Sequence, residues 1–259
     1  MDTRRLNHIF RPDGRALIVA MEHAAIFGPG KGTEDPGATI KQVVAGGASA
    51  VMASFGIIRC FVKELAPVGV ILRSDGAPTI LGPDASAPVW FGVEEALRLD
   101  ADGICISAFP GHHSEGQSLD NLAQIAREAH KWGLALQGEM VPGGMTAAPE
   151  SRTVESVALA ARLGCELGAD WVKVPYVDGF ERVVRGCYKP VVILGGSKRG
   201  STLEVFKEVR AALDAGAAGV TMGRNIWESD DPQAMTAALA ALIHEDASVE
   251  KAMSIWGRD

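Results

Sequence analysis

Eight short apolar segments recur along the chain of 259 residues, and longer amphipathic stretches separate them. The expected strands are Ala16–His23, Ala50–Gly56, Val68–Ser74, Gly103–Pro110, Leu134–Met140, Asp170–Tyr176, Pro190–Gly196 and Gly219–Arg224. Ser118–Trp132 carries apolar residues near helical spacing, and Thr153–Leu167 begins with a threonine suited to an N-terminal cap. Helical crossovers imply parallel neighbouring strands. The pattern therefore predicts an α/β fold, a closed (β/α)8 TIM barrel, with residues 1–259 forming a single domain.

Two further features favour a closed barrel over an open doubly wound sheet. The first strand ends in Met21-Glu22-His23, without the GxGxxG turn that often follows the first strand of such a sheet. Several helix-to-strand joints also share a small-residue signature, which is typical of a helix that ends in a left-handed glycine. These joints are Gly46-Gly47-Ala48, Gly168-Ala169-Asp170 and Gly216-Ala217-Ala218.

The composition limits the class of protein and its partners. With 47% hydrophobic and 22% charged residues, the chain has the makeup of a soluble globular enzyme, and its net charge of −7 argues against nucleic acid as the main partner. It has no signal-like N-terminus and no run of about 18 apolar residues, so we expect a cytoplasmic protein that does not bind or span a membrane. The cysteines form no CxxC pair and are expected to be reduced core residues: Cys60, Cys105, Cys165 and Cys187.

A lysine lies inside the sixth predicted strand, in the sequence Trp171-Val172-Lys173-Val174. Desolvating an ammonium group is costly, so a lysine in a buried strand often has a chemical task. A neutral amine can attack a carbonyl carbon and form a Schiff base. The alternative is a lysine that reaches solvent at the rim of the barrel or pairs with an acid such as Glu139.

Glycine-bearing segments follow the seventh and eighth predicted strands. Barrel enzymes often bind phosphate through these two loops. Gly195 and Gly196 allow the backbone to approach an anion, the amides of Ser197 and Gly223 can donate hydrogen bonds, and Arg224 supplies a positive charge. The sequence therefore predicts a phosphorylated small-molecule substrate.

Other polar residues follow the remaining strands, and they are expected to gather at the carboxyl-terminal rim, where barrel chemistry lies. Among them are Glu22 and His23 after strand one, Arg73 in strand three and Glu139 in strand five. The adjacent histidines His112 and His113 have no metal-ligand spacing, so we predict neither a metal site nor a cofactor.

These residues resemble the archaeal-type class I fructose-bisphosphate aldolases and their relatives in the deoxyribose-phosphate aldolase superfamily, which include the autoinducer-2 thiolase and the aminodideoxyheptulosonate synthases. The similarity spans nearly the whole chain. The segments that carry it are Ala20-Met21-Glu22-His23 with Gly28-Pro29, Asp170–Tyr176, Val191–Lys198 and Gly223–Trp227. The resemblance implies a Schiff-base lysine at Lys173, a strand-one carboxylate at Glu22 and a homo-oligomer.

The same resemblance places the phosphate-binding residues of the family at positions that the residue types already suggested. The predicted catalytic residues are Lys173, Glu22, Glu139 and His23, and the predicted substrate or phosphate contacts are Gly195, Gly196, Ser197, Gly223, Arg224 and Arg73.

Strand five departs from the family. The fructose-bisphosphate aldolases and heptulosonate synthases carry a Trp-x-Tyr-Pro-Arg-Gly pattern whose tyrosine is the acid/base, and this chain has Val141 for the tyrosine and Gly143 for the arginine. The expected activity is a class I aldolase acting on a phosphorylated ketose, with Glu139 as first choice of base, because burial can raise a carboxyl pKa toward neutrality, and Glu22 as second. Glu139 is equally well explained as the counter-ion of Lys173.

Two other functions remain open. Loss of the tyrosine is compatible with thiolase-like transfer of an acyl group from a phosphorylated diketone to coenzyme A. It is also compatible with a barrel that binds a sugar phosphate without catalysis.

Overall fold

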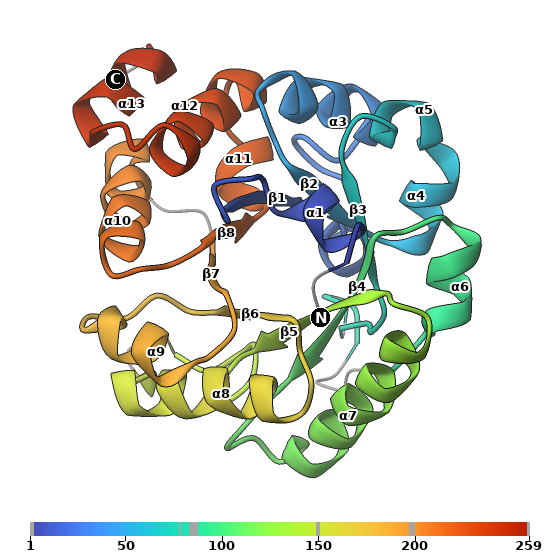
Figure 1. Cartoon of the computed structure of the whole chain (residues 1–259). Coiled ribbons are helices and arrows are strands. Elements are labelled where there is room, and N and C mark those ends of the chain that lie inside the picture. Colours follow the sequence, from blue (N-terminus) through green and yellow to red (C-terminus); the bar gives the residue numbers. More distant parts are fainter. Residues whose placement is uncertain (1–2, 78, 83–87, 149–150, 197–199, 258–259) are drawn as a thin grey trace.

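The computed structural model describes residues 3–257 except 78, 83–87, 149–150 and 197–199. Eight parallel strands close into a barrel in chain order, with β1 paired to β8 (Figure 1). The strands are β1 (Ala16–Ala20), β2 (Ala50–Ala53), β3 (Gly69–Arg73), β4 (Gly103–Ala108), β5 (Ala135–Met140), β6 (Trp171–Val174), β7 (Val191–Leu194) and β8 (Gly219–Met222). The predicted TIM barrel and its eight strands are confirmed. Seven strands end one to three residues earlier than expected, because the chain leaves the sheet as it enters the polar rim.

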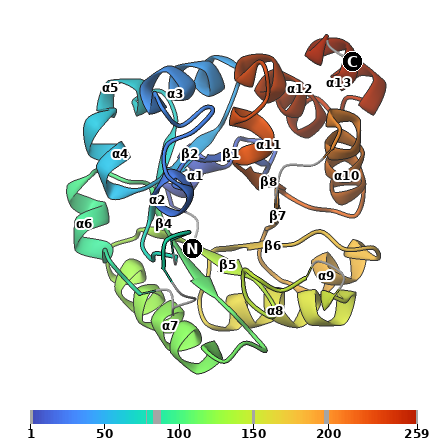
Figure 2. The ribbon, with the colours of Figure 1, turned by 180° about the vertical axis from the view of Figure 1, so that it is seen from behind.

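Helices surround the barrel (Figures 1 and 2). In chain order they are α1 (Leu6–Ile9), α2 (Ala24–Phe27), α3 (Pro36–Ala45), α4 (Phe55–Cys60), α5 (Val62–Leu65), α6 (Val93–Arg98), α7 (Glu115–Lys131), α8 (Val154–Glu166), α9 (Phe180–Gly186), α10 (Thr202–Asp214), α11 (Arg224–Trp227), α12 (Pro232–His244) and α13 (Val249–Trp256). The two helices expected from spacing correspond to α7 and α8. Thr153 caps α8 as predicted, because its hydroxyl oxygen accepts a hydrogen bond from the Ser156 amide.

The predicted glycine joints are confirmed by their backbone. Gly47, Gly168 and Gly216 have φ of +98°, +104° and +95°, in the region that side chains disfavour. At the end of α8 the Ala169 amide donates to the Gly164 carbonyl and the Gly168 amide to the Cys165 carbonyl, which is the Schellman pattern. Each joint turns a helix sharply back toward the next strand.

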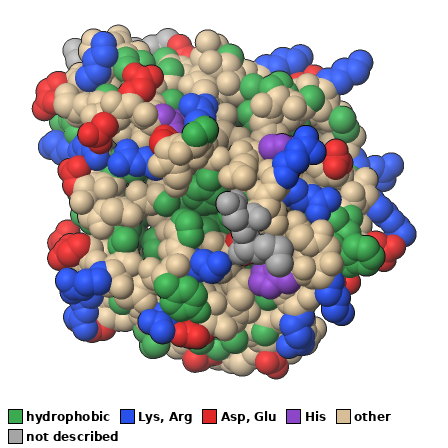
Figure 3. Space-filling model, viewed as in Figure 1, with side chains coloured by type: hydrophobic (Ala, Val, Ile, Leu, Met, Phe, Trp, Pro, Cys, Tyr) green, Lys and Arg blue, Asp and Glu red, His purple; other side chains and the backbone are tan. Residues whose placement is uncertain are grey.

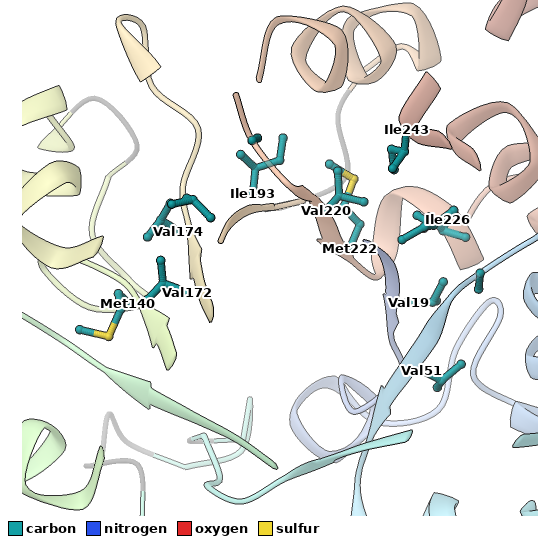
Figure 4. Packing of buried hydrophobic residues seen from close by; sticks show 14 of the residues in the cluster. Val19, Val51, Met140, Val172, Val174, Ile193, Val220, Met222, Ile226 and Ile243 are labelled. Carbon is teal, nitrogen blue, oxygen red and sulfur yellow. The ribbon is translucent and has the colours of Figure 1, made fainter. Parts of the chain in front are cut away.

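The barrel wall separates two apolar regions. Outward-facing strand side chains such as Val172 and Val220 pack under the helices, and Ile226 of α11 belongs to the same cluster (Figure 4). Inside, Phe10 follows α1 and contacts Trp171 edge-on, with 5.7 Å between ring centroids. The amino-terminal end of the barrel interior is therefore filled with side chains.

Charged side chains spread over the outer parts of the face viewed in Figure 1, whereas hydrophobic side chains gather nearer its middle (Figure 3). In the part of the chain that the structure describes, no helix is both long enough and apolar enough to span a bilayer.

Candidate active site

The inward-facing side chains change character along the strands. On β3 the residue two positions after the apolar Ile71 is Arg73, and on β6 the residue two positions after Trp171 is Lys173. Because side chains alternate across a strand, each of these pairs faces the same side of the barrel wall. Lys173 is 4% exposed, and Glu139, its register partner on β5, is 5% exposed. The barrel therefore contains a buried charged layer above its apolar floor.

Lys173 and Glu139 form the centre of this layer. The Lys173 Nζ atom lies 2.8 Å from Glu139 Oε1. The other carboxylate oxygen, Oε2, accepts a short hydrogen bond from Arg73 Nη1. Glu139 therefore bridges two buried cations, one from β6 and one from β3.

Arg73 is held in turn by Asp75 and Ser107. Its Nε atom lies 2.7 Å from Asp75 Oδ1, and Nη2 donates a short hydrogen bond to the Ser107 hydroxyl. Asp75 Oδ2 accepts from the Ser107 amide at 3.1 Å. The guanidinium group of Arg73 is thus occupied by contacts within the layer, and the described structure shows no contact between it and the predicted phosphate loops.

The balance of burial and charge decides the protonation of Glu139. Burial alone would raise the pKa of this carboxyl group, but the charges of Lys173 and Arg73 outweigh burial and lower the pKa to about 2. The expected rise toward neutrality is therefore wrong in direction, because the sequence did not reveal that Arg73 contacts Glu139. Glu139 is ionised at neutral pH.

Glu22 and His23 lie on the β1 side of the mouth. Glu22 Oε2 is 3.8 Å from His23 Nδ1, and neither atom has a hydrogen-bond partner among the described residues. Burial lowers the pKa of His23, which favours the neutral ring. The ring contacts Trp227 edge-on at 5.6 Å between centroids. This pair therefore offers one carboxylate oxygen and one imidazole nitrogen that form no hydrogen bond within the described residues.

The ends of β7 and β8 are tied together by Asn225, whose amide donates to the Gly195 carbonyl oxygen at 2.8 Å. A Cβ atom at Gly195 would lie 2.9 Å from Met222 Cγ, and one at Gly223 would lie 2.7 Å from the Ala20 carbonyl oxygen. Glycine is required at both positions by this close approach. The predicted contact Ser197 lies outside the described residues.

Arg224 begins α11 and points its guanidinium group over the Phe27 ring, 5.4 Å from the centroid. Its Nε atom is buried without a hydrogen-bond partner among the described residues. A cavity of about 240 Å³ adjoins it, lined by His23, Ala24, Phe27, Gly28, Pro29, Gly30, Lys31, Thr33, Arg224, Trp227 and Glu228. Viewed from the side opposite to Figure 1, α2 and α11 lie near the middle of the ring of helices (Figure 2).

Sequence reasoning assigned no role in the site to Asp75, Ser107 or Asn225. Asp75 and Ser107 follow Arg73 and Cys105 at a spacing of two, so the alternation of a strand was the available signal for both. Asn225 gave no comparable signal, because its role depends on a loop that is distant in the sequence. Within the described residues, no group of three His, Cys, Asp or Glu side chains could hold a metal ion.

A family model and several known proteins match this chain over most of its length. The family model of the DeoC/LacD family aldolases matches residues 16–229. A 2-amino-3,7-dideoxy-D-threo-hept-6-ulosonate synthase of Halobacterium salinarum is 36% identical, over 98% of this chain and 96% of that protein. A 3-hydroxy-5-phosphonooxypentane-2,4-dione thiolase of Yersinia enterocolitica is 34% identical, over 97% of this chain and 85% of that protein.

A solved structure of a Schiff-base-forming fructose-1,6-bisphosphate aldolase, from work on its reaction intermediates, is also similar. It has a TM-score of 0.84 and 31% identity, and the match covers 93% of this chain and 98% of that chain. The solved aldolase thus shares the barrel, and the names of the relatives indicate more than one activity.

Proposed function

Because the chain belongs to the DeoC/LacD family of aldolases, we propose that it is a class I aldolase that forms or cleaves a carbon–carbon bond in a phosphorylated ketose through an imine on Lys173. The observation that carries this proposal is the Lys173 amine, buried inside the barrel and 2.8 Å from Glu139. Support also comes from the similar solved aldolase, which is described as Schiff-base-forming.

The chemistry begins when the unprotonated Lys173 amine attacks the ketone carbon. The resulting carbinolamine takes up one proton and loses water to give a protonated imine, and a base then removes the proton of the β-hydroxyl group. The bond between the α and β carbons breaks, its electrons move into the imine to form an enamine, and an aldehyde departs. Protonation and hydrolysis of the enamine release the second product. The imine is the electron sink, so this route needs no metal ion.

We assign Glu139 as the counter-ion of Lys173 and Glu22 as the base. A carboxylate held by two cations is a poor proton acceptor, and the pKa of Glu139 is about 2. Glu22 has one buried oxygen without a hydrogen-bond partner, close to the neutral ring of His23. The pair can receive the hydroxyl proton and return it to the enamine. This reverses the order expected from the sequence, in which Glu139 was the first choice.

We further propose that the loops after β7 and β8 bind the substrate phosphate, through the backbone near Gly195, Gly196, Ser197 and Gly223 and the side chain of Arg224. The unpartnered Nε atom of Arg224 supports this role. Arg73, which was expected to contact substrate, is better assigned as a positioning residue, because its guanidinium group already binds Glu139, Asp75 and Ser107.

The test is aldehyde release from a panel of phosphorylated ketoses, measured for the native protein and for Lys173→Met. The account predicts turnover of at least one member of the panel by the native protein and a loss of at least about a thousandfold in the variant. Equal turnover by both proteins would overturn it.

A thiolase-like activity is the second candidate, and a specific observation favours it. Val141, which stands where the related aldolases have their acid/base tyrosine, is buried and cannot transfer a proton. One of the similar proteins is itself named a thiolase. Turnover of a phosphorylated diketone only in the presence of coenzyme A would select this activity, whereas turnover of ketoses without coenzyme A selects the aldolase.

A further inference from the structure

Two cysteines that are far from the candidate active site lie close together outside the barrel wall. Cys165 is in the last turn of α8, and Cys187 directly follows α9. Their sulfur atoms are 2.9 Å apart, although the residues are separated by 22 positions in the sequence. Both are free thiols, 4% and 9% exposed. The sequence indicated four unrelated core cysteines, so this pairing is a product of the fold.

The surroundings of the pair make the two sulfur atoms unequal. The hydrogen bond with the Cys165 thiol lowers the pKa of Cys187 to about 7, and Arg162 contributes in the same direction. The same hydrogen bond raises the pKa of Cys165. The thiolate is the reactive form of cysteine, so the lowered pKa favours Cys187 as the sulfur that reacts first and Cys165 as the one that closes the disulfide.

We propose that Cys165 and Cys187 form an oxidation site that reacts with hydroperoxides and closes to a disulfide. The Cys187 thiolate attacks a peroxide oxygen, the oxygen–oxygen bond breaks, and Cys187 becomes a sulfenic acid while hydroxide leaves and takes up a proton. The Cys165 sulfur then attacks the Cys187 sulfur, forms the disulfide and displaces water. Overall two thiols are oxidised, and one hydrogen peroxide is reduced to two waters.

The geometry requires only a small movement. A disulfide has a sulfur–sulfur distance of about 2.05 Å, so the two atoms need to approach by roughly 0.9 Å from their separation of 2.9 Å. Cys187 itself is 9% exposed, compared with 4% for Cys165, which leaves its sulfur the more accessible of the two to a small oxidant. No element of the barrel has to unfold for the bond to form.

The other two cysteines serve as internal controls. Cys60 is exposed at the end of α4 and has no partner thiol nearby, so it can be oxidised but cannot close an intramolecular disulfide. Cys105 is fully buried inside the barrel, and burial raises the pKa of its thiol. A disulfide between Cys165 and Cys187 alone is therefore the specific expectation.

The disulfide would join the end of α8 to the segment that leads into β7. Such a link restricts the unfolded chain, and a closed loop of about this length raises the melting temperature of a chain of this size by roughly 6–12 °C. This inference does not depend on the proposed aldolase activity, because neither cysteine contacts the candidate active site.

The experiment treats the folded, fully reduced protein with hydrogen peroxide at pH 6 and pH 8, and then maps its peptides without reduction. The expected result is a peptide pair linked through Cys165 and Cys187, formed several times faster at pH 8, with a higher melting temperature that dithiothreitol reverses. The Cys165→Ala variant should accumulate sulfenic or sulfinic acid on Cys187, and Cys60→Ala should link normally. Oxidation confined to Cys60, or a native protein in which Cys187 is oxidised without linking to Cys165, would overturn the proposal.

Discussion

The two ends of the barrel interior are built from the same strands, but one end is apolar and the other is charged. At the amino-terminal end, Ile71 and Trp171 are among the apolar side chains that fill the barrel around Phe10. Two residues further along the same strands, Arg73 and Lys173 belong to the charged layer. The difference shows that a move of two residues along a strand, on the same face, separates an apolar floor that stabilises the fold from the charged layer that contains the candidate catalytic lysine.

The charged layer is tolerated because its charges alternate. The order Lys173, Glu139, Arg73, Asp75 runs positive, negative, positive, negative, and each neighbour is within ion-pair distance. A single charge buried without a partner would cost several kcal/mol, and removing one member of a buried pair costs about 3–5 kcal/mol. The layer therefore acts as a unit, whereas residues of the apolar floor contribute mainly through the area they bury.

The strongest test of the difference is Lys173→Met. Because the proposed reaction passes through the lysine imine, we expect turnover to fall at least about a thousandfold. Steady-state kinetics on the best substrate measures this effect. The exposed Lys207, which pairs with Glu204 on α10, provides a matched control, and Lys207→Met should leave turnover unchanged. Comparable losses in the two variants would show that the charged layer has no special role.

On the apolar floor, Trp171→Ala should reduce the free energy of unfolding by about 3–5 kcal/mol, because it leaves a cavity at a fully buried position. Urea denaturation measures the loss. Trp132 is 62% exposed, and Trp132→Ala should change the same quantity by less than about 0.5 kcal/mol. If both variants lost similar stability, Trp171 would not be a structural centre of the floor.

The pH dependence of stability in Glu139→Gln tests whether the charged layer is held by ion pairs. The folded-state pKa of Glu139 is lowered to about 2, so its ionic contribution to stability is complete above the ordinary value of 4.5 and is lost as pH falls toward 2. The stability difference between the native protein and Glu139→Gln should therefore shrink by on the order of 2 kcal/mol between pH 7 and pH 3. Urea midpoints at the two pH values decide this. A difference that is independent of pH would contradict the ion-pair assignment.

The smallest expected effects are changes in KM and kcat that distinguish the role of Arg224 from that of Arg73. Arg224→Ala should raise KM for a phosphorylated substrate about tenfold with a smaller change in kcat, because it removes binding of a group distant from the reacting carbon. Arg73→Lys keeps the charge but loses the planar fork, so it should lower kcat about tenfold with little change in KM. The opposite assignment of the two effects would restore Arg73 as a substrate contact.

The alternation of apolar and amphipathic segments was sufficient to predict the barrel. The glycine joints could be predicted because a helix that ends in a left-handed residue favours glycine there. Lys173 could also be selected as a candidate, because a lysine inside a buried strand is unusual. The glycines after β7 and β8 could be selected because glycine at these turns lets the backbone approach an anion. The protonation of Glu139 could not be predicted, since it depends on Arg73 approaching across two intervening strand pairings. The contact between Cys165 and Cys187 was hidden for a similar reason: nothing in a spacing of 22 residues indicates that two sulfur atoms meet.

The most direct test of the charged layer is reduction with borohydride in the presence of dihydroxyacetone phosphate, followed by intact mass and peptide mapping. The account predicts a single stable adduct, located on Lys173 and absent from Lys173→Met. Parallel reactions with other phosphorylated ketones and diketones would show which carbonyl compounds the lysine accepts. An adduct on a different lysine, or none with any of these compounds, would contradict the assignment of Lys173 as the nucleophile.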